Sequence, residues 1–75
     1  EGSVLGRELA DVARAELDKL PERQRQVVTM RDMLGFESSE VCDLLEISAA
    51  NQRVLLHRGR AAVRQALEAY LTERS

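Results

Sequence analysis

The sequence predicts an all-α domain that consists of four helices. Apolar residues recur at the three- and four-residue spacing of an α-helix along most of the chain, which is the pattern of helices that bury one face. With one proline and four glycines among 75 residues, no internal linker is visible, and no internal repeat is present. A chain of this length allows one small domain, over residues 1–75, with a modest hydrophobic core.

The first two helices are predicted over residues 4–20 and 21–34. In the first helix, the apolar residues at helical spacing are Leu5, Leu9, Val12, Ala13 and Leu17. Pro21 suits the first turn of the second helix, where its missing N–H costs nothing. The buried stripe expected for the second helix consists of Val27, Met30, Met33 and Leu34. Gly35 is expected to end this helix in the left-handed conformation.

A short third helix is predicted over residues 39–45, and a long fourth helix from residue 49 to about residue 71. Ser38 and Ser48 are the expected N-caps, because a serine hydroxyl can accept a hydrogen bond from a free N–H of the first helical turn. The third helix is expected to bury the face that carries Val41, Leu44 and Leu45. The two helices and their turn form a helix-turn-helix over about residues 38–60, whose second helix can lie in the DNA major groove.

The fourth helix divides into an inner and an outer face when Leu56 is placed at the centre of the inner face. The inner face then also carries Gln52, Gly59, Val63, Leu67 and Tyr70. Gly59 would allow another helix to approach closely. The outer face carries Ala50, Val54, His57, Arg58 and Ala61, flanked by Arg53 and Arg60 on one side and by Asn51 and Leu55 on the other. Small residues and arginines suit entry into a DNA groove, because arginine can reach guanine edges or phosphates.

The charge of the chain is distributed unevenly. The net charge of −2 is unfavourable for a DNA-binding protein, because phosphate contacts dominate the affinity. However, residues 1–46 carry eleven acidic and six basic residues, whereas residues 47–75 carry five arginines and two glutamates. The fourth helix is therefore the basic part of the chain and the expected DNA-binding element.

No pattern in the sequence indicates an enzyme or a metal site. Cys42 and His57 are single residues of their types, so neither a metal cluster nor an internal disulfide is expected. Cys42 is expected to behave as a small buried residue. No apolar run is long enough to span a membrane, and no signal peptide is visible. We therefore expect a cytoplasmic protein without a cofactor.

Residues 20–67 carry an ordered set of features that resembles one known family. The set consists of Leu20-Pro21, Gly35, Glu40-Val41, Leu44-Leu45, Ile47 in the turn, and Arg58 and Arg60 late in the fourth helix. It resembles region 4 of a sigma-70 family factor of the extracytoplasmic-function (ECF) group. The resemblance implies a piece of a longer bacterial sigma factor that reads the promoter −35 element, while a second domain opens the −10 region. It also implies docking on the flap of the RNA polymerase β subunit and masking by an anti-sigma factor.

Seven residues are the candidates for DNA binding. The main candidates are Arg53, Arg58 and Arg60, on the outer side of the fourth helix. The secondary candidates are Ser48, Asn51 and His57. Arg31 is a candidate for a phosphate contact, because in the resembled family the end of the second helix lies near a DNA phosphate.

Four sites depart from the family pattern. Cys42 stands where alanine is usual. Asn51-Gln52 stands where a Thr-Val pair is common, so Gln52 is either a semi-buried polar residue that needs a partner or, like Asn51, a residue that contacts adenine. Val54-Leu55 stands where a polar residue and an arginine are common. These two side chains are expected on the outer face, against thymine methyl groups or a partner protein. Glu46 stands where many relatives have glycine in the turn.

Two other functions fit the same sequence. One is the DNA-binding domain of a LuxR-type response regulator, which has a related four-helix arrangement. The basic Arg58-x-Arg60 ending and the Leu20-Pro21 start favour the sigma interpretation. The other is a helical protein-interaction module that does not read DNA, which the acidic first half and the Val54-Leu55 pair would suit.

Overall fold

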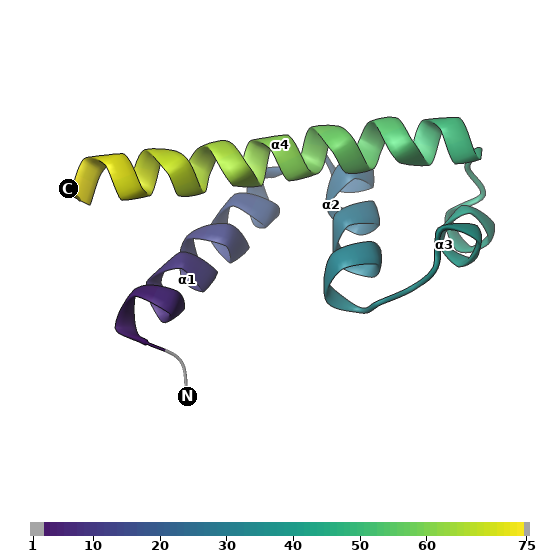
Figure 1. Ribbon diagram of the computed structural model, residues 1–75. Helices are drawn as coiled ribbons and strands as arrows, with labels where there is room; N and C mark the ends of the chain where they lie inside the picture. The colour runs from purple at the N-terminus through teal and green to yellow at the C-terminus, as the bar shows by residue number, and fades with distance from the viewer. Residues whose placement is uncertain (1–2, 75) are drawn as a thin grey trace.

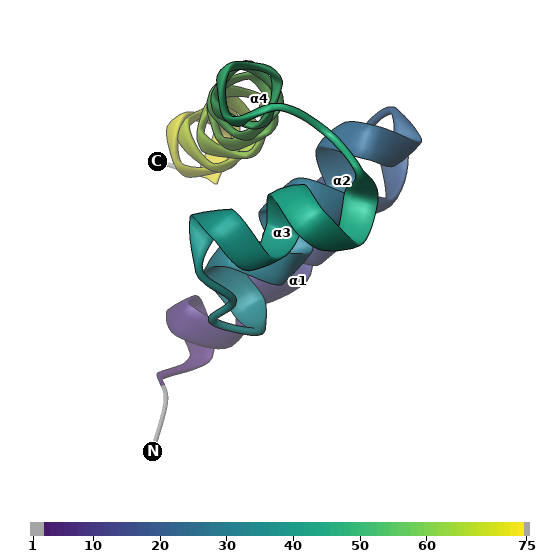
Figure 2. The same ribbon diagram turned by 90° about the vertical axis from the view of Figure 1, so that its right-hand side faces the viewer.

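The computed structural model describes residues 3–74 and contains four α-helices, as predicted. They are α1 (Val4–Lys19), α2 (Glu22–Val28), α3 (Ser38–Leu45) and α4 (Ala49–Arg74), and α2 continues directly into one π-helical turn, η1 (Thr29–Met33). Figure 1 shows α4 as a long rod, with α1 and α2 crossing it and α3 at its N-terminal end. Figure 2, which looks nearly along α4, shows that α1, α2 and α3 all lie on the same side of it. The other side of α4 is left open.

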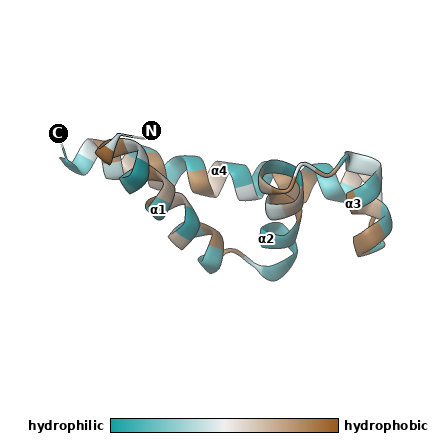
Figure 3. Ribbon diagram, turned by 90° about the horizontal axis from the view of Figure 1, so that it is seen from below, coloured by the Kyte–Doolittle hydropathy of each residue, from teal (hydrophilic) through white to brown (hydrophobic). Residues whose placement is uncertain are grey.

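The hydrophobic core joins all four helices. It consists of Leu17, Leu20, Val27, Val28, Val41 and Leu56. The buried residues of α4 are Gln52, Leu56 and Gly59, which confirms the predicted inner face around Leu56. Hydrophilic and hydrophobic residues alternate along α4 in Figure 3, as a helix with one buried side requires.

Gly59 lies where α4 touches α2. A Cβ atom at this position would lie 2.5 Å from Cγ2 of Val28, closer than two carbon atoms can approach. The predicted close approach is therefore confirmed, and the neighbouring helix is α2.

The predicted apolar stripe of the second helix is wrong at its C-terminal end. Val27 and Val28 are buried, but Met33 and Leu34 are 57% and 60% exposed. The π-helical turn explains the difference, because its wider turn takes more residues than an α-helical turn and shifts the later side chains around the axis. Leu44 of α3 is also exposed, so α3 meets the core through Val41 and Leu45 instead.

The N-cap predicted for α3 is also wrong. Glu37 is the N-cap, and its N–H donates to Oε1 of Glu40 at 2.7 Å in a capping box. Ser38 is the first residue of the helix, and its hydroxyl accepts a hydrogen bond from Gln52 instead. The predicted cap of α4 is confirmed, because the N–H of Asn51 donates to Oγ of Ser48 at 3.0 Å.

The two turns around α3 use left-handed backbone conformations. Gly35 has φ +78°, as predicted, and Glu46 has φ +57° between α3 and α4. This conformation is unfavourable for a residue with a side chain, so Glu46 adopts at some cost what glycine would adopt freely. Within residues 3–74, no helix is both long and apolar enough to cross a membrane.

Candidate nucleic-acid interface

The exposed residues of the first three turns of α4 lie on its open side and at its edges. They are Ala49, Ala50, Asn51, Arg53, Val54, His57, Arg58 and Arg60. The helix starts with two small exposed residues, so its N-terminal end can come close to a groove without steric hindrance. We call the surface formed by residues 49–58 of this set the reading face.

Arg53 and Arg58 are the cations of the reading face. Both are exposed, and within residues 3–74 neither takes part in an ion pair or a side-chain hydrogen bond. Each guanidinium presents five N–H donors in a planar fork, which fits a phosphate or a guanine edge. The side chains are therefore available to an anionic or nucleic-acid ligand without breaking an internal contact.

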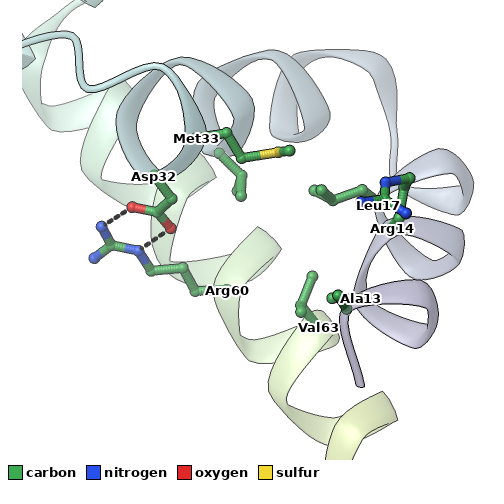
Figure 4. Close-up of a pocket in the computed structure, with 9 residues that line it drawn as sticks. Ala13, Arg14, Leu17, Asp32, Met33, Arg60 and Val63 are labelled. Carbon is green, nitrogen blue, oxygen red and sulfur yellow. Dashed lines mark hydrogen bonds and ion pairs between the residues drawn. The ribbon is translucent and has the colours of Figure 1, made fainter. Parts of the chain in front are cut away.

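Arg60 has a partner on η1. Its Nε donates to Oδ2 of Asp32 at 2.8 Å, and its Nη2 donates to Oδ1 of the same carboxylate (Figure 4). The hydrogen bonds and the charge of Arg60 hold the pKa of Asp32 below its usual value, against the opposing effect of partial burial. The carboxylate in turn raises the pKa of Arg60. The structure thus places this main candidate in a bidentate ion pair that holds α4 against η1.

Gln52 is fully buried, with 0% of its surface exposed. Its Oε1 accepts a hydrogen bond from Nη1 of Arg31 at 2.7 Å. Its Nε2 donates to Oγ of Ser38 at 2.5 Å and, more weakly, to Sγ of Cys42 at 3.6 Å. The interpretation of Gln52 as a buried polar residue with a partner is confirmed, and its alternative contact with adenine is excluded by burial. Cys42 is half-buried and lies in this polar cluster, which differs from the fully buried position expected for it.

Arg31 is half-buried, and one of its amino groups is used by Gln52. Within the described part of the chain, its remaining N–H groups have no hydrogen-bond partner. A phosphate contact by Arg31 is therefore compatible with the structure.

The two apolar residues expected on the outer face are placed differently. Val54 is 45% exposed and belongs to the reading face. Leu55 is half-buried and packs against the core, so the prediction for it is wrong. Consecutive residues of a helix are rotated by about 100°, which puts Leu55 at the edge of the buried side next to Leu56.

An apolar groove lies between α1, η1 and α4, away from the reading face. Its volume is about 300 Å³, and its apolar lining consists of Ala10, Ala13, Leu17, Val28, Met33 and Val63. Figure 4 shows Arg14 at one side of the groove and the Asp32–Arg60 ion pair at the other. Because Val63 is close to Leu56 on the helical wheel, the groove opens on the inner flank of α4 and not on the reading face.

Comparison with known proteins identifies the family. Residues 10–63 match the family model of Sigma-70, region 4. The chain belongs to this family. Region 4 is the domain that binds the −35 promoter element in sigma factors, and the family is not enzymatic. The match confirms the predicted family and fold, and it favours the sigma interpretation over a LuxR-type response regulator.

One relative is an ECF sigma factor. The chain is 28% identical over 67 residues to the ECF RNA polymerase sigma factor SigW of Bacillus subtilis (strain 168). The aligned part is 89% of this chain and 36% of SigW, so the chain spans about a third of the length of that relative. No solved structure matches the chain significantly.

The structure brings five of the seven candidate residues together. Ser48, Asn51, Arg53, His57 and Arg58 lie in and just before the first three turns of α4 and are exposed. Arg31 and Arg60 lie at the edge of this group, and each has a protein partner, Gln52 for Arg31 and Asp32 for Arg60. The sequence did not reveal Gln52 as the partner of Arg31 or Asp32 as the partner of Arg60, because contacts between residues 21 and 28 positions apart leave no local spacing signal.

Proposed function

We propose that this domain of a sigma factor reads the −35 element through the reading face of α4. The observation that carries the proposal is a pair of exposed arginines, Arg53 and Arg58, that have no side-chain partner within residues 3–74 and lie on a helix that begins with small residues. In the proposed complex, these arginines contact guanine edges or phosphates, and Asn51 and His57 contribute further polar contacts. The hydroxyl of Ser48 accepts the capping bond and can still donate to a phosphate.

Arg31 and Arg60 are assigned to phosphates rather than to bases. Each retains N–H donors beyond those used by Gln52 or Asp32. A phosphate contact fixes the protein on the duplex but carries little sequence information. Arg60 is expected to contribute less than Arg53 and Arg58, because the carboxylate of Asp32 partly neutralises it.

We further propose that the domain acts within a longer sigma factor that directs RNA polymerase to promoters in the cytoplasm. The family binds polymerase as well as DNA. The apolar groove between α1, η1 and α4 is our candidate for the docking site of the β-subunit flap. An apolar surface of this kind suits a protein partner, and its position leaves the reading face free for DNA at the same time. An anti-sigma factor that covered either surface would block the function.

Docking on polymerase would also compensate for the charge of the chain. A domain with net charge −2 and two arginines on its reading face gains little from phosphate contacts. Tethering makes the −35 contact intramolecular, at an effective concentration that reaches about the millimolar range. The isolated domain is therefore expected to bind a −35 duplex weakly.

Transcription from a promoter library with a randomised −35 element tests the proposal. The full-length protein is combined with core RNA polymerase, and the Arg58→Ala variant is compared with Arg7→Ala as a matched control. Arg7 is an exposed arginine of α1, away from the reading face. Arg58→Ala should weaken promoter binding by about 1–3 kcal/mol and relax the −35 preference, whereas Arg7→Ala should leave both unchanged. Equal activity of two folded variants would contradict the proposal.

A further inference from the structure

Gln52 differs from the other buried residues of the described chain because its side chain is polar. A buried amide is costly unless its donors and acceptor are hydrogen-bonded. In Gln52 all of them are used, because Oε1 accepts from Arg31 while Nε2 donates to Ser38 and Cys42. Within residues 3–74, no buried side-chain nitrogen or oxygen lacks a partner.

The partners of Gln52 come from both elements that support the start of α4. Arg31 belongs to η1, and Ser38 and Cys42 belong to α3. Gln52 itself belongs to the first turns of α4, directly between the exposed residues Asn51 and Arg53. The side chain of Gln52 therefore connects α4 to η1 and to α3, within the same N-terminal turns of α4 that carry the reading face.

Hydrogen bonds fix this end of α4 in a way that apolar contacts cannot. An apolar side chain of similar size would fill the same space, but hydrophobic contacts are non-directional and tolerate small rotations of the helix. Hydrogen bonds weaken steeply when their angle or distance changes. A rotation or an axial shift of α4 would misalign all three bonds of Gln52 together. Buried polar groups are known to set register in this manner in other helical proteins.

We propose that Gln52 is a positioning residue that determines −35 specificity without touching DNA. It holds the reading face at one rotation and one height relative to α3 and η1, so that Arg53 and Arg58 meet defined base pairs. The proposal rests on the proposed function, because it requires that α4 reads the −35 element. It adds a residue whose role is the accuracy of reading and not the strength of binding.

The test uses holoenzyme formed from core polymerase and the full-length protein, with promoters carrying the preferred −35 sequence or single substitutions in it. The variants are Gln52→Met, which keeps the length of the side chain but removes its hydrogen bonds, and Ser38→Ala, which removes one partner. Val27→Ala is the matched control, because Val27 is buried in α2 but belongs neither to the polar cluster nor to the lining of the apolar groove. The quantity measured is the ratio of affinities for the preferred and the substituted promoters.

This ratio separates positioning from stability. A variant that only lowers the folded fraction weakens binding to every promoter by the same factor, so the ratio does not change. A substituted base pair normally costs about 1–3 kcal/mol. We expect Gln52→Met to reduce the resulting discrimination by about threefold or more, and Val27→Ala to leave it unchanged. Ser38→Ala should reduce it less, and the double variant should lose no more than Gln52→Met alone, because both changes break the same network.

The outcomes distinguish this proposal from the proposed function. If Gln52→Met and Ser38→Ala keep the wild-type ratio while Arg58→Ala lowers it, the positioning role of Gln52 is overturned and the function of α4 stands. If wild-type holoenzyme shows no −35 preference, both proposals are overturned. If Gln52→Met fails to fold, Ser38→Ala decides, and an unchanged ratio in that variant overturns the positioning role.

Discussion

The arginines at the two ends of α4 have different surroundings. Near the N-terminal end, Arg53 and Arg58 are exposed and have no ion-pair partner within residues 3–74. Near the C-terminal end, Nη1 of Arg74 donates to Oε1 of Glu8, which also accepts a hydrogen bond from the hydroxyl of Tyr70 at 2.8 Å. The guanidinium of Arg74 also lies 5.9 Å from the centre of the Tyr70 ring.

The ion-pair partner that distinguishes Arg74 comes from a neighbour of α4, whereas Tyr70 of α4 itself adds a further contact. Glu8 in the N-terminal half of α1 supplies the carboxylate that pairs with Arg74 at the C-terminal end of α4. Around the reading face, the acidic residues of α3 do not form ion pairs with α4 within the described chain. The same residue type therefore serves packing at one end of the helix and remains available for binding at the other. Arg60, between the two ends, is exposed and paired like Arg74.

The largest change in stability is expected from a substitution in the hydrophobic core beneath α4. Leu56→Ala should destabilise the domain by about 2–5 kcal/mol, because it removes a buried side chain and leaves a cavity beneath the N-terminal half of α4. That is a large share of the stability of so small a domain. Thermal unfolding followed by circular dichroism checks it. A melting temperature within a degree or two of wild type would show that the inner face of α4 is assigned wrongly.

Alanine substitutions at the two ends sharpen the comparison. Arg53→Ala should weaken promoter binding of the holoenzyme by about 1–3 kcal/mol and leave the melting temperature of the domain unchanged. Arg74→Ala should leave promoter binding unchanged and lower the melting temperature slightly, because it loses contacts with Glu8 and Tyr70. The comparison fails if Arg74→Ala impairs promoter binding as much as Arg53→Ala does.

The ion pair of Arg60 allows a substitution that should strengthen promoter binding instead of weakening it. Asp32→Asn should free the guanidinium for a phosphate, so that promoter binding becomes tighter and its salt dependence steeper by up to about 0.9 in the log–log slope. Titrations of promoter binding at several salt concentrations measure this slope. A slope unchanged from wild type would show that Arg60 does not reach DNA even when it is released.

The same ion pair predicts a small dependence of stability on pH. Because the folded-state pKa of Asp32 is lowered, its contribution is present above the ordinary aspartate pKa of 3.8 and is lost as the pH falls through the folded-state value. The pair is exposed enough that its contribution is at most about 1 kcal/mol. Asp32→Asn should remove this part of the acid sensitivity in melts between pH 6 and pH 3. An identical pH profile in the two proteins would contradict the assignment.

The sequence was most informative where local periodicity controls the structure. The helix count, the inner face around Leu56, the Ser48 cap and the left-handed Gly35 all follow from spacing and residue type. The exposed position of Met33 did not follow, because a π-helical turn changes the period inside a continuous helical segment. Periodicity also could not show that Glu37 rather than Ser38 caps α3, since both choices leave the same apolar pattern.

The candidate site was predictable in its composition but not in its internal partners. The helical wheel placed Arg53, His57 and Arg58 on the open side of α4, and all three side chains are exposed in the structure. It could not show that Asp32 would pair with Arg60, because that contact depends on how η1 crosses α4. The burial of Gln52 followed from the wheel, whereas the identity of its partners required the positions of α3 and η1.

The most direct test of the reading face is site-specific photocrosslinking in the promoter-bound holoenzyme. A photoreactive phenylalanine analogue replaces Val54 on the reading face or, as a matched control, Gln65. Both residues are exposed and lie on the same side of α4, but Gln65 is eleven residues further along, roughly 16 Å at 1.5 Å per residue. We expect the probe at Val54 to crosslink to bases of the −35 element and the probe at Gln65 to give no crosslink there. Crosslinks to the −35 element from Gln65 but not from Val54, in active holoenzyme, would contradict the assignment of DNA reading to the N-terminal half of α4.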